Sequence, residues 1–179
     1  MRMNVSIILI LFMMASVGCD SPADFSCDDA YDLIVNNNGQ QTKRYTSSFA
    51  NDNFLPRERL TTMFFPKDSG KYDLVVHFYA EAPQDTIPDS RATYNQLVIA
   101  GKGGSGDIQI PLEEGDTYAG KKQITLYASN LEESVINKIA NMRIRSVDLL
   151  FSLYVSNCGS KNEIKAFQKK LSCMIGTTE

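Results

Sequence analysis

The chain has 179 residues, of which 18 are Lys or Arg and 21 are Asp or Glu, giving a formal net charge of −3 at pH 7. This balance argues against nucleic acid or an anionic membrane surface as the main partner, and the length suits one domain with its own core. A single histidine and the lack of a Cys-x-x-Cys pair also argue against a zinc site, and we expect no cofactor.

The first eighteen residues have the pattern of a cleaved secretory signal. Arg2 is the only charge before the apolar run 5–14, and small residues follow it up to Gly18. The run is shorter than the roughly 20 residues that a membrane-spanning helix needs. We therefore expect cleavage after Gly18 and an exported product, either secreted or held in the periplasm or cell envelope.

A second processing route stays open at the same place. Ser16-Val17-Gly18-Cys19 resembles a bacterial lipoprotein signal, and this resemblance implies a lipid on Cys19, although Ser16 stands where such signals usually carry Leu. Such a lipid is the only membrane contact that we expect. After the signal no Asn-x-Ser/Thr sequence occurs, which favours a bacterial envelope over a glycosylating secretory pathway.

The four cysteines fall into two clusters. Cys19 and Cys27 are near the N-terminus, and Cys158 and Cys173 are near the C-terminus. An unbroken helix over 161–173 would hold Cys158 and Cys173 roughly 18 Å apart, whereas a disulfide needs Cα atoms within about 7 Å. We therefore expect each of these two cysteines to pair with the N-terminal cluster. If Cys19 carries a lipid instead, one bridge and one odd thiol are expected.

The chain is predicted to hold a flexible lead at 19–29 and a single β-rich domain at 30–176. Turn residues at 36–39 and 66–70 separate the first strand pairs, and two long loops are expected at 47–58 and 81–93. Alternating apolar residues predict strands at 30–35, 40–46, 60–65, 71–80, 94–100, 107–112 and 122–129.

The last third of the chain contains helical patterns in addition to a strand pattern. Asn130 followed by Glu133 is typical of a helix start, and apolar spacing predicts a helix near 131–142. A long strand is expected at 144–155, and a capping box at Ser160 begins a helix at 161–174. The predicted fold class is α+β, an antiparallel β-sandwich or curled sheet with two C-terminal helices packed on it.

The glycine-rich stretch 101–106 satisfies G-x-G-x-x-G, which could cradle phosphates. Such a loop needs a helix directly after it, because the helix N-terminal amides hold the phosphates. Here Asp107 and an alternating strand follow instead, so a hairpin loop is the expectation. His77 is interpreted as a packed or surface residue, because no second histidine can form a relay with it and no G-x-S-x-G elbow is present.

Charged residues in the remaining patterns are interpreted as solvated. Carboxylates at 68, 73, 113, 114 and 116 lie in or beside turns and could bind calcium, but no EF-hand spacing is present. Lysines at 161, 165 and 169 form an i,i+4 stripe on the last helix. We therefore expect no catalytic, cofactor-binding or metal-binding residues.

One segment carries a family resemblance. Residues 70–81, Gly-Lys-Tyr-Asp-Leu-Val-Val-His-Phe-Tyr-Ala-Glu, resemble the central strand of malectin-like carbohydrate-binding jelly rolls. Tyr94, Leu97, Ile99 and Gly101 are similar to the strand that follows in that family. The resemblance implies a β-sandwich and raises sugar binding as an option, but it assigns no binding residues.

Three aromatic side chains in or near the 47–58 stretch are candidates for facing a ligand: Tyr45, Phe49 and Phe54. The alternative is that each ring packs in the hydrophobic core. The first functional hypothesis is an exported, non-enzymatic binding module that meets a protein or glycan through the two long loops. The second is a bacterial envelope lipoprotein acting as an accessory, assembly or inhibitory subunit, and a small secreted hydrolase ranks last.

Overall fold

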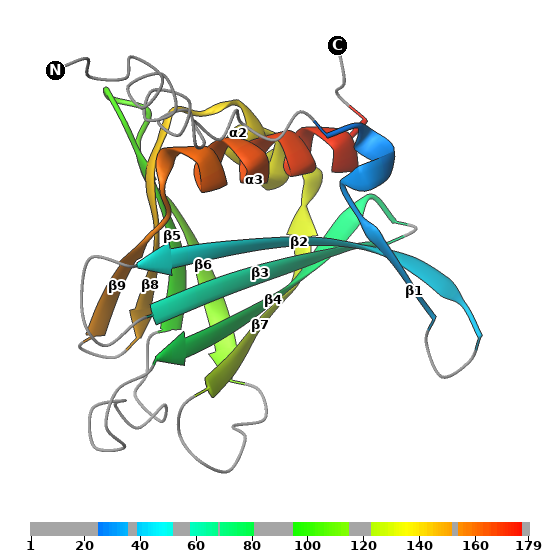
Figure 1. Ribbon diagram of the computed structural model, residues 1–179, viewed down its shortest axis with the longest axis horizontal. Coiled ribbons are helices and arrows are strands. Elements are labelled where there is room, and N and C mark those ends of the chain that lie inside the picture. Colours follow the sequence, from blue (N-terminus) through cyan, green and yellow to red (C-terminus); the bar gives the residue numbers. More distant parts are fainter. Residues whose placement is uncertain are drawn as a thin grey trace, which may run out of the picture.

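The computed structural model describes residues 25–35, 39–51, 58–67, 69–80, 95–114, 123–151 and 154–176. Strands dominate, and the helices come late in the chain (Figure 1). The elements are the 3₁₀ turn η1 (Cys27–Asp29), strands β1 (Asp32–Val35), β2 (Gln41–Asn51), β3 (Glu58–Pro66), β4 (Lys71–Ala80), β5 (Asn95–Gly101), β6 (Ile108–Glu114) and β7 (Gln123–Glu132), helix α2 (Glu133–Asn141), strands β8 (Ile144–Phe151) and β9 (Tyr154–Cys158), and helix α3 (Lys161–Met174).

All strands belong to one antiparallel sheet with the order β1-β2-β3-β4-β7-β6-β5-β8-β9. The sheet curls, so that β9 also approaches β2 and β3 without pairing with them along its length. Just after β9, the N–H of Gly159 donates to the carbonyl oxygen of Ala50 on β2 at 3.5 Å. Helix α3 lies across the curl above β2 (Figure 1). The predicted fold class, an α+β curled antiparallel sheet with two C-terminal helices, is confirmed.

The core fills the inside of the curl. Alternation along β3 and β4 sends every second side chain inward, β5 is buried at consecutive positions, and α3 adds one fully buried aromatic ring. The ring of Phe167 meets Phe49 edge-on at a centroid distance of 5.3 Å and lies 6.2 Å from Phe64. Helix α3 is therefore held to β2 and β3 by aromatic packing as well as by area burial.

Helix α3 begins and ends as its sequence predicts. The Ser160 side chain accepts from the Glu163 backbone N–H at 3.3 Å, and the Glu163 carboxylate accepts from the Ser160 N–H at 2.6 Å. This reciprocal pair satisfies two amides that a helix N-terminus leaves without partners. At mid-helix, the Gln168 amide donates to three carbonyls at the end of α2, those of Ile139, Ala140 and Met142.

The helix expected at 131–142 covers only Glu133–Asn141, because β7 continues through Glu132. The expectation that Asn130 caps this helix was wrong. Asn130 instead adopts a left-handed backbone with φ of 58°, and its N–H donates to the Asp73 carboxylate at 3.1 Å. Lys67 contacts both side chains, at 2.7 Å from Asp73 and 3.1 Å from Asn130. The strand pairing shifts its register here, so the cluster stabilises an irregularity that turns β7 toward α2.

Two other expected segments differ from the structure. Residues 47–51 were expected in a loop but extend β2, since they pair with β3, Phe49 belongs to the core, and the Ala50 N–H donates to Glu163 of α3. The single strand expected at 144–155 is two strands. Phe151 pairs with Tyr154, so the chain reverses where no Gly, Pro or Asn announces a turn.

A disulfide joins the two ends of the domain. Cys27 in η1 bonds to Cys173 in the last turn of α3, with the Cα atoms 5.3 Å apart and a sequence separation of 146. This confirms the prediction that Cys173 pairs with the N-terminal cluster. Cys19 and the side chain of Cys158 lie outside the described residues, so their predicted pairing stays a prediction.

The segment 19–29 was expected to be a flexible lead, but its last part is fixed to α3. The disulfide and η1 hold it in place, and the Phe25 ring lies 4.7 Å from the Lys169 ammonium and 5.9 Å from that of Lys170. These cation–π contacts also engage part of the lysine stripe that was interpreted as solvated. Residues 19–24 lie outside the described residues.

Candidate binding surface

Two of the three aromatic residues proposed to face a ligand are core residues. Tyr45 is 5% exposed and Phe49 is 0% exposed, because both lie on the inward-facing alternation of β2. Tyr45 packs against the Tyr31 ring at 5.6 Å, and burial raises the pKa of its hydroxyl. The ligand-facing interpretation was therefore wrong for Tyr45 and Phe49. Phe54 lies outside the described residues.

The glycine-rich stretch 101–106 joins β5 to β6 as a hairpin, as predicted. The Asp107 carboxylate accepts from the Gly101 N–H at 2.9 Å, and the Lys102 N–H donates to the carbonyl of Arg143 at 2.7 Å. A Cβ atom at Gly101 would come within 2.2 Å of the Gly106 carbonyl oxygen, so the glycine is needed for close backbone approach. No helix follows, and a carboxylate occupies the loop, so this is not a phosphate cradle.

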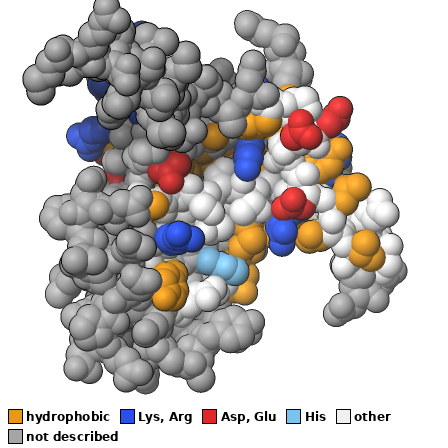
Figure 2. Space-filling view, viewed as in Figure 1, with side chains coloured by type: hydrophobic (Ala, Val, Ile, Leu, Met, Phe, Trp, Pro, Cys, Tyr) orange, Lys and Arg blue, Asp and Glu red, His pale blue; other side chains and the backbone are white. Residues whose placement is uncertain are grey.

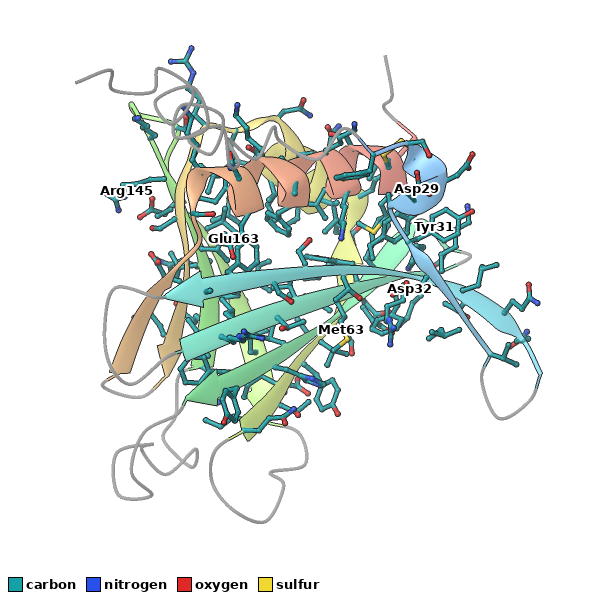
Figure 3. All side chains as sticks on the ribbon, in the orientation of Figure 1. Asp29, Tyr31, Asp32, Met63, Arg145 and Glu163 are labelled. Carbon is teal, nitrogen blue, oxygen red and sulfur yellow. A yellow bond between two sulfur atoms is a disulfide. The ribbon has the colours of Figure 1, made fainter. Side chains whose placement is uncertain are left out.

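The surface with the most suggestive chemistry is the outer side of strands β3, β4 and β7. Alternate residues of these strands point away from the core, and register pairs place them beside one another. We call this surface the outer face, and define it by Arg59, Thr61, Met63, Val75, His77, Tyr79, Gln123 and Tyr127. Thr125, opposite His77, points to the same side but is only 3% exposed. In Figure 2 the pale blue histidine lies in the middle of this side, with basic and hydrophobic side chains beside it.

Two tyrosines are the prominent groups of the outer face. Tyr79 is 36% exposed and stands between its register partners Arg59 and Gln123. Tyr127 is 38% exposed and stands opposite Val75, four positions before Tyr79. Four positions along a strand correspond to about 13 Å. The two exposed rings therefore bracket the middle of the outer face, where His77 lies.

His77 is half-buried between these rings. Burial lowers the pKa of its imidazole below 6.5, so the ring is neutral near pH 7. The Gln123 amide nitrogen lies 3.5 Å from Nδ1 of His77. A neutral imidazole has one donor and one acceptor nitrogen, so His77 offers uncharged hydrogen-bonding groups at the centre of the outer face.

Among the described residues, no three His, Cys, Asp or Glu side chains lie close enough together to hold a metal ion. Asp73, one of the carboxylates considered for calcium, is engaged with Lys67 and Asn130. The outer face can donate and accept hydrogen bonds and can stack on flat groups through its tyrosine rings.

Part of the outer face could be predicted from the sequence. In a strand at 71–80, alternation puts Val75, His77 and Tyr79 on one side. Tyr127 was missed, because its place beside Val75 depends on pairing between β4 and β7, which are far apart in sequence. The available signal was the alternation of Gln123, Thr125, Tyr127 and Ser129 with the apolar positions between them.

Comparison with known proteins adds no functional assignment, since no family model, no curated protein and no solved structure matches the chain. Within the part of the chain that the structure describes, none of the helices has the length and hydropathy needed to cross a bilayer.

Proposed function

We propose that this protein is an exported, non-enzymatic binding module that recognises a protein partner through the outer face. The observation that carries the proposal is the exposure of Tyr79 and Tyr127 on either side of His77. Both helices contribute their buried residues to the inner side of the sheet and leave this side free of helical cover (Figures 1 and 2).

The residue types support a protein interface. Tyrosine and arginine are enriched where proteins meet, because each combines a large contact area with a polar group. Tyr79 and Arg59 are direct neighbours here, and Met63 with Val75 adds apolar area beside Tyr127. An extended sheet side also suits a macromolecule better than a small molecule, which usually needs a concave site.

Export is supported by two independent features. The first eighteen residues have the signal pattern described above, and the Cys27–Cys173 disulfide suits an oxidising compartment. The partner would then be a protein of the cell envelope or the extracellular space.

Site-specific photo-crosslinking in the native host tests the proposal. A photoreactive phenylalanine analogue at position 79 or 127 is expected to give one discrete crosslinked product, and the same residue at exposed Lys138 on α2 serves as the matched control. Once the product is identified, Tyr79→Ser and Tyr127→Ser should each weaken its binding to the purified chain at least tenfold. Equal crosslinking at 79, 127 and 138, or unchanged affinity in both serine variants, would reject the outer face as the interface.

A glycan is the second candidate ligand, and one observation favours it. The segment that resembles malectin-like domains, 70–81, contains β4, the strand that carries His77 and Tyr79. A glycan array probed with the native protein and with Tyr79→Ser tests this option. A signal that disappears in the variant would support a sugar ligand, whereas no signal on the array would remove it.

A further inference from the structure

A second surface, separate from the outer face, lies on the hairpin formed by β1 and β2. Strand β1 is the terminal strand of the sheet, and this hairpin projects from the body of the molecule (Figure 1). Leu33 is 59% exposed and Val35 is 64% exposed. Tyr31, Leu33 and Val35 are alternate residues on one side of the chain. Tyr31 packs on Tyr45 at the margin of the core, whereas Leu33 and Val35 extend into solvent.

The backbone of β2 that does not pair with β1 is covered by another element. Beyond Tyr45, α3 covers it: Lys170 Nζ donates to the Thr46 carbonyl at 2.6 Å, and Glu163 accepts from the Ala50 N–H at 3.2 Å. Within the described residues, β1 pairs only with β2, and its regular register includes none of the bulges or prolines that discourage strand pairing. Strand β1 is therefore an open edge with apolar side chains.

We infer that β1 pairs antiparallel with β1 of a second copy of this chain, about a two-fold axis through Ile34. This register places Leu33 opposite Val35 of the second copy and Val35 opposite its Leu33. Directly opposed residues of an antiparallel pair share one face of the sheet. Four aliphatic side chains then gather on one face, with the same contacts made by both copies, as a two-fold interface requires.

The charges near β1 are compatible with this pairing. Asp32 is already bonded to Arg44 at 3.1 Å, and the Lys43 ammonium lies 4.3 Å from the centre of the Tyr31 ring. In the proposed register the two copies of Asp32 are offset by four positions, about 13 Å along the strands, beyond a Debye length of roughly 10 Å at 0.1 M salt. No like charges oppose each other.

Two other candidates for covering the β1–β2 hairpin, the segment before η1 and a membrane surface, fit it less well. Residues 19–24, Cys-Asp-Ser-Pro-Ala-Asp, offer no large apolar side chain to cover Leu33 and Val35. An anionic lipid surface would meet exposed carboxylates at Asp28 and Asp29, while both nearby cations are engaged. The short strand predicts a weak dimer, because few side chains and backbone groups take part.

Sedimentation equilibrium of the exported chain carrying C19S/C158S, which removes any lipid and leaves no odd thiol, tests the dimer. The average mass should rise with concentration, and L33T/V35T should weaken the association at least tenfold. Tyr79→Ser should leave it unchanged, while L33T/V35T should leave photo-crosslinking at positions 79 and 127 unchanged. Failure of the dimer is thereby distinguishable from failure of the proposed function.

A cysteine scan tests the register. Opposed Cα atoms in an antiparallel pair lie about 4.5–5.5 Å apart, within the span of a disulfide. Ile34→Cys should therefore form a covalent dimer on oxidation, and exposed Ser134→Cys on α2 should not. A monomer at every concentration, or equal crosslinking of the two variants, would overturn the inference. Vesicle binding that L33T/V35T abolishes, without any dimer, would also overturn it and assign the hairpin to a membrane.

Discussion

Glu163 and Ala50, 113 positions apart in sequence, are joined by a hydrogen bond from the Ala50 backbone N–H to the Glu163 carboxylate at 3.2 Å. The same carboxylate closes the capping box of α3 through the Ser160 N–H. One side chain therefore starts a helix and supplies a partner to the strand beneath it. The start of α3 and the position of β2 are consequently coupled.

This coupling predicts different costs for two neighbouring substitutions. Ser160→Ala should lower the free energy of unfolding by about 1 kcal/mol, the usual effect of losing a helix cap. Glu163→Ala should cost roughly 2–3 kcal/mol, because the Ala50 amide also loses a charged acceptor. Urea denaturation measures both, with exposed Lys165→Ala as the control. Equal costs for the Ser160 and Glu163 variants would show that the contact with β2 contributes nothing.

The disulfide should dominate the stability of the domain. Joining residues 146 positions apart restricts the unfolded chain, and the loop-entropy model gives about 5 kcal/mol for a loop of this size. C27S/C173S should therefore be far less stable in urea than the native protein. A C19S/C158S background removes the second predicted bridge. In that background, reductant should reproduce the loss caused by C27S/C173S, and it should change the protein with all four substitutions little. A small difference between the native and double-variant midpoints would contradict this prediction.

Two glycines of the β5–β6 hairpin are needed for different reasons, one for its left-handed backbone and one for a close backbone approach. Gly103 has φ of 66° and open space around its Cβ position, so Gly103→Ala should cost only the left-handed backbone penalty, about 1–2 kcal/mol. Gly101→Ala should cost more, because its Cβ would meet the Gly106 carbonyl oxygen at 2.2 Å. Thermal denaturation of both variants checks the order, and a Gly101 variant as stable as the Gly103 variant would refute the close approach.

Asp148 should impose a pH dependence. Burial raises the pKa of this carboxyl, outweighing the Ser146 hydrogen bond and the nearby Arg145, while Asp107 raises the pKa further. With the folded pKa above the unfolded value of 3.8, the cost of the charge is present at neutral pH and disappears as the pH falls through the folded pKa toward 3.8.

Asp148→Asn should therefore raise the urea midpoint at about pH 7.5, with a smaller gain at about pH 4. The Asn side chain can still accept from the Ser146 hydroxyl, whose oxygen lies 2.9 Å from the Asp148 carboxylate. A gain of equal size at both pH values would show that ionisation of Asp148 is not the cause.

Local signals made parts of the fold predictable. Helix α3 was predicted from its capping box and apolar stripe, and the Cys27–Cys173 bond followed in part from the length of that helix. The β8–β9 reversal was missed because the two positions between Phe151 and Tyr154 are Ser152 and Leu153, which include none of the strong turn residues Gly, Pro, Asn and Asp.

Long-range pairing explains the errors about the site. Phe49 was proposed as a ligand contact because nothing near it in sequence announces Phe167, the ring that covers it. Tyr127 was missed for the same reason, because its neighbour Val75 belongs to a distant strand. A strand's alternation defines two sides, but only the packing of remote elements decides which side is buried.

The intact mass of the protein isolated from its native host, with and without reductant, tests most directly the claim that this is an exported, disulfide-linked module. The account predicts a chain that begins at Cys19, with or without the mass of a lipid, and that gains two hydrogens or more on reduction. A chain that retains Met1 and has the same mass before and after reduction would contradict it.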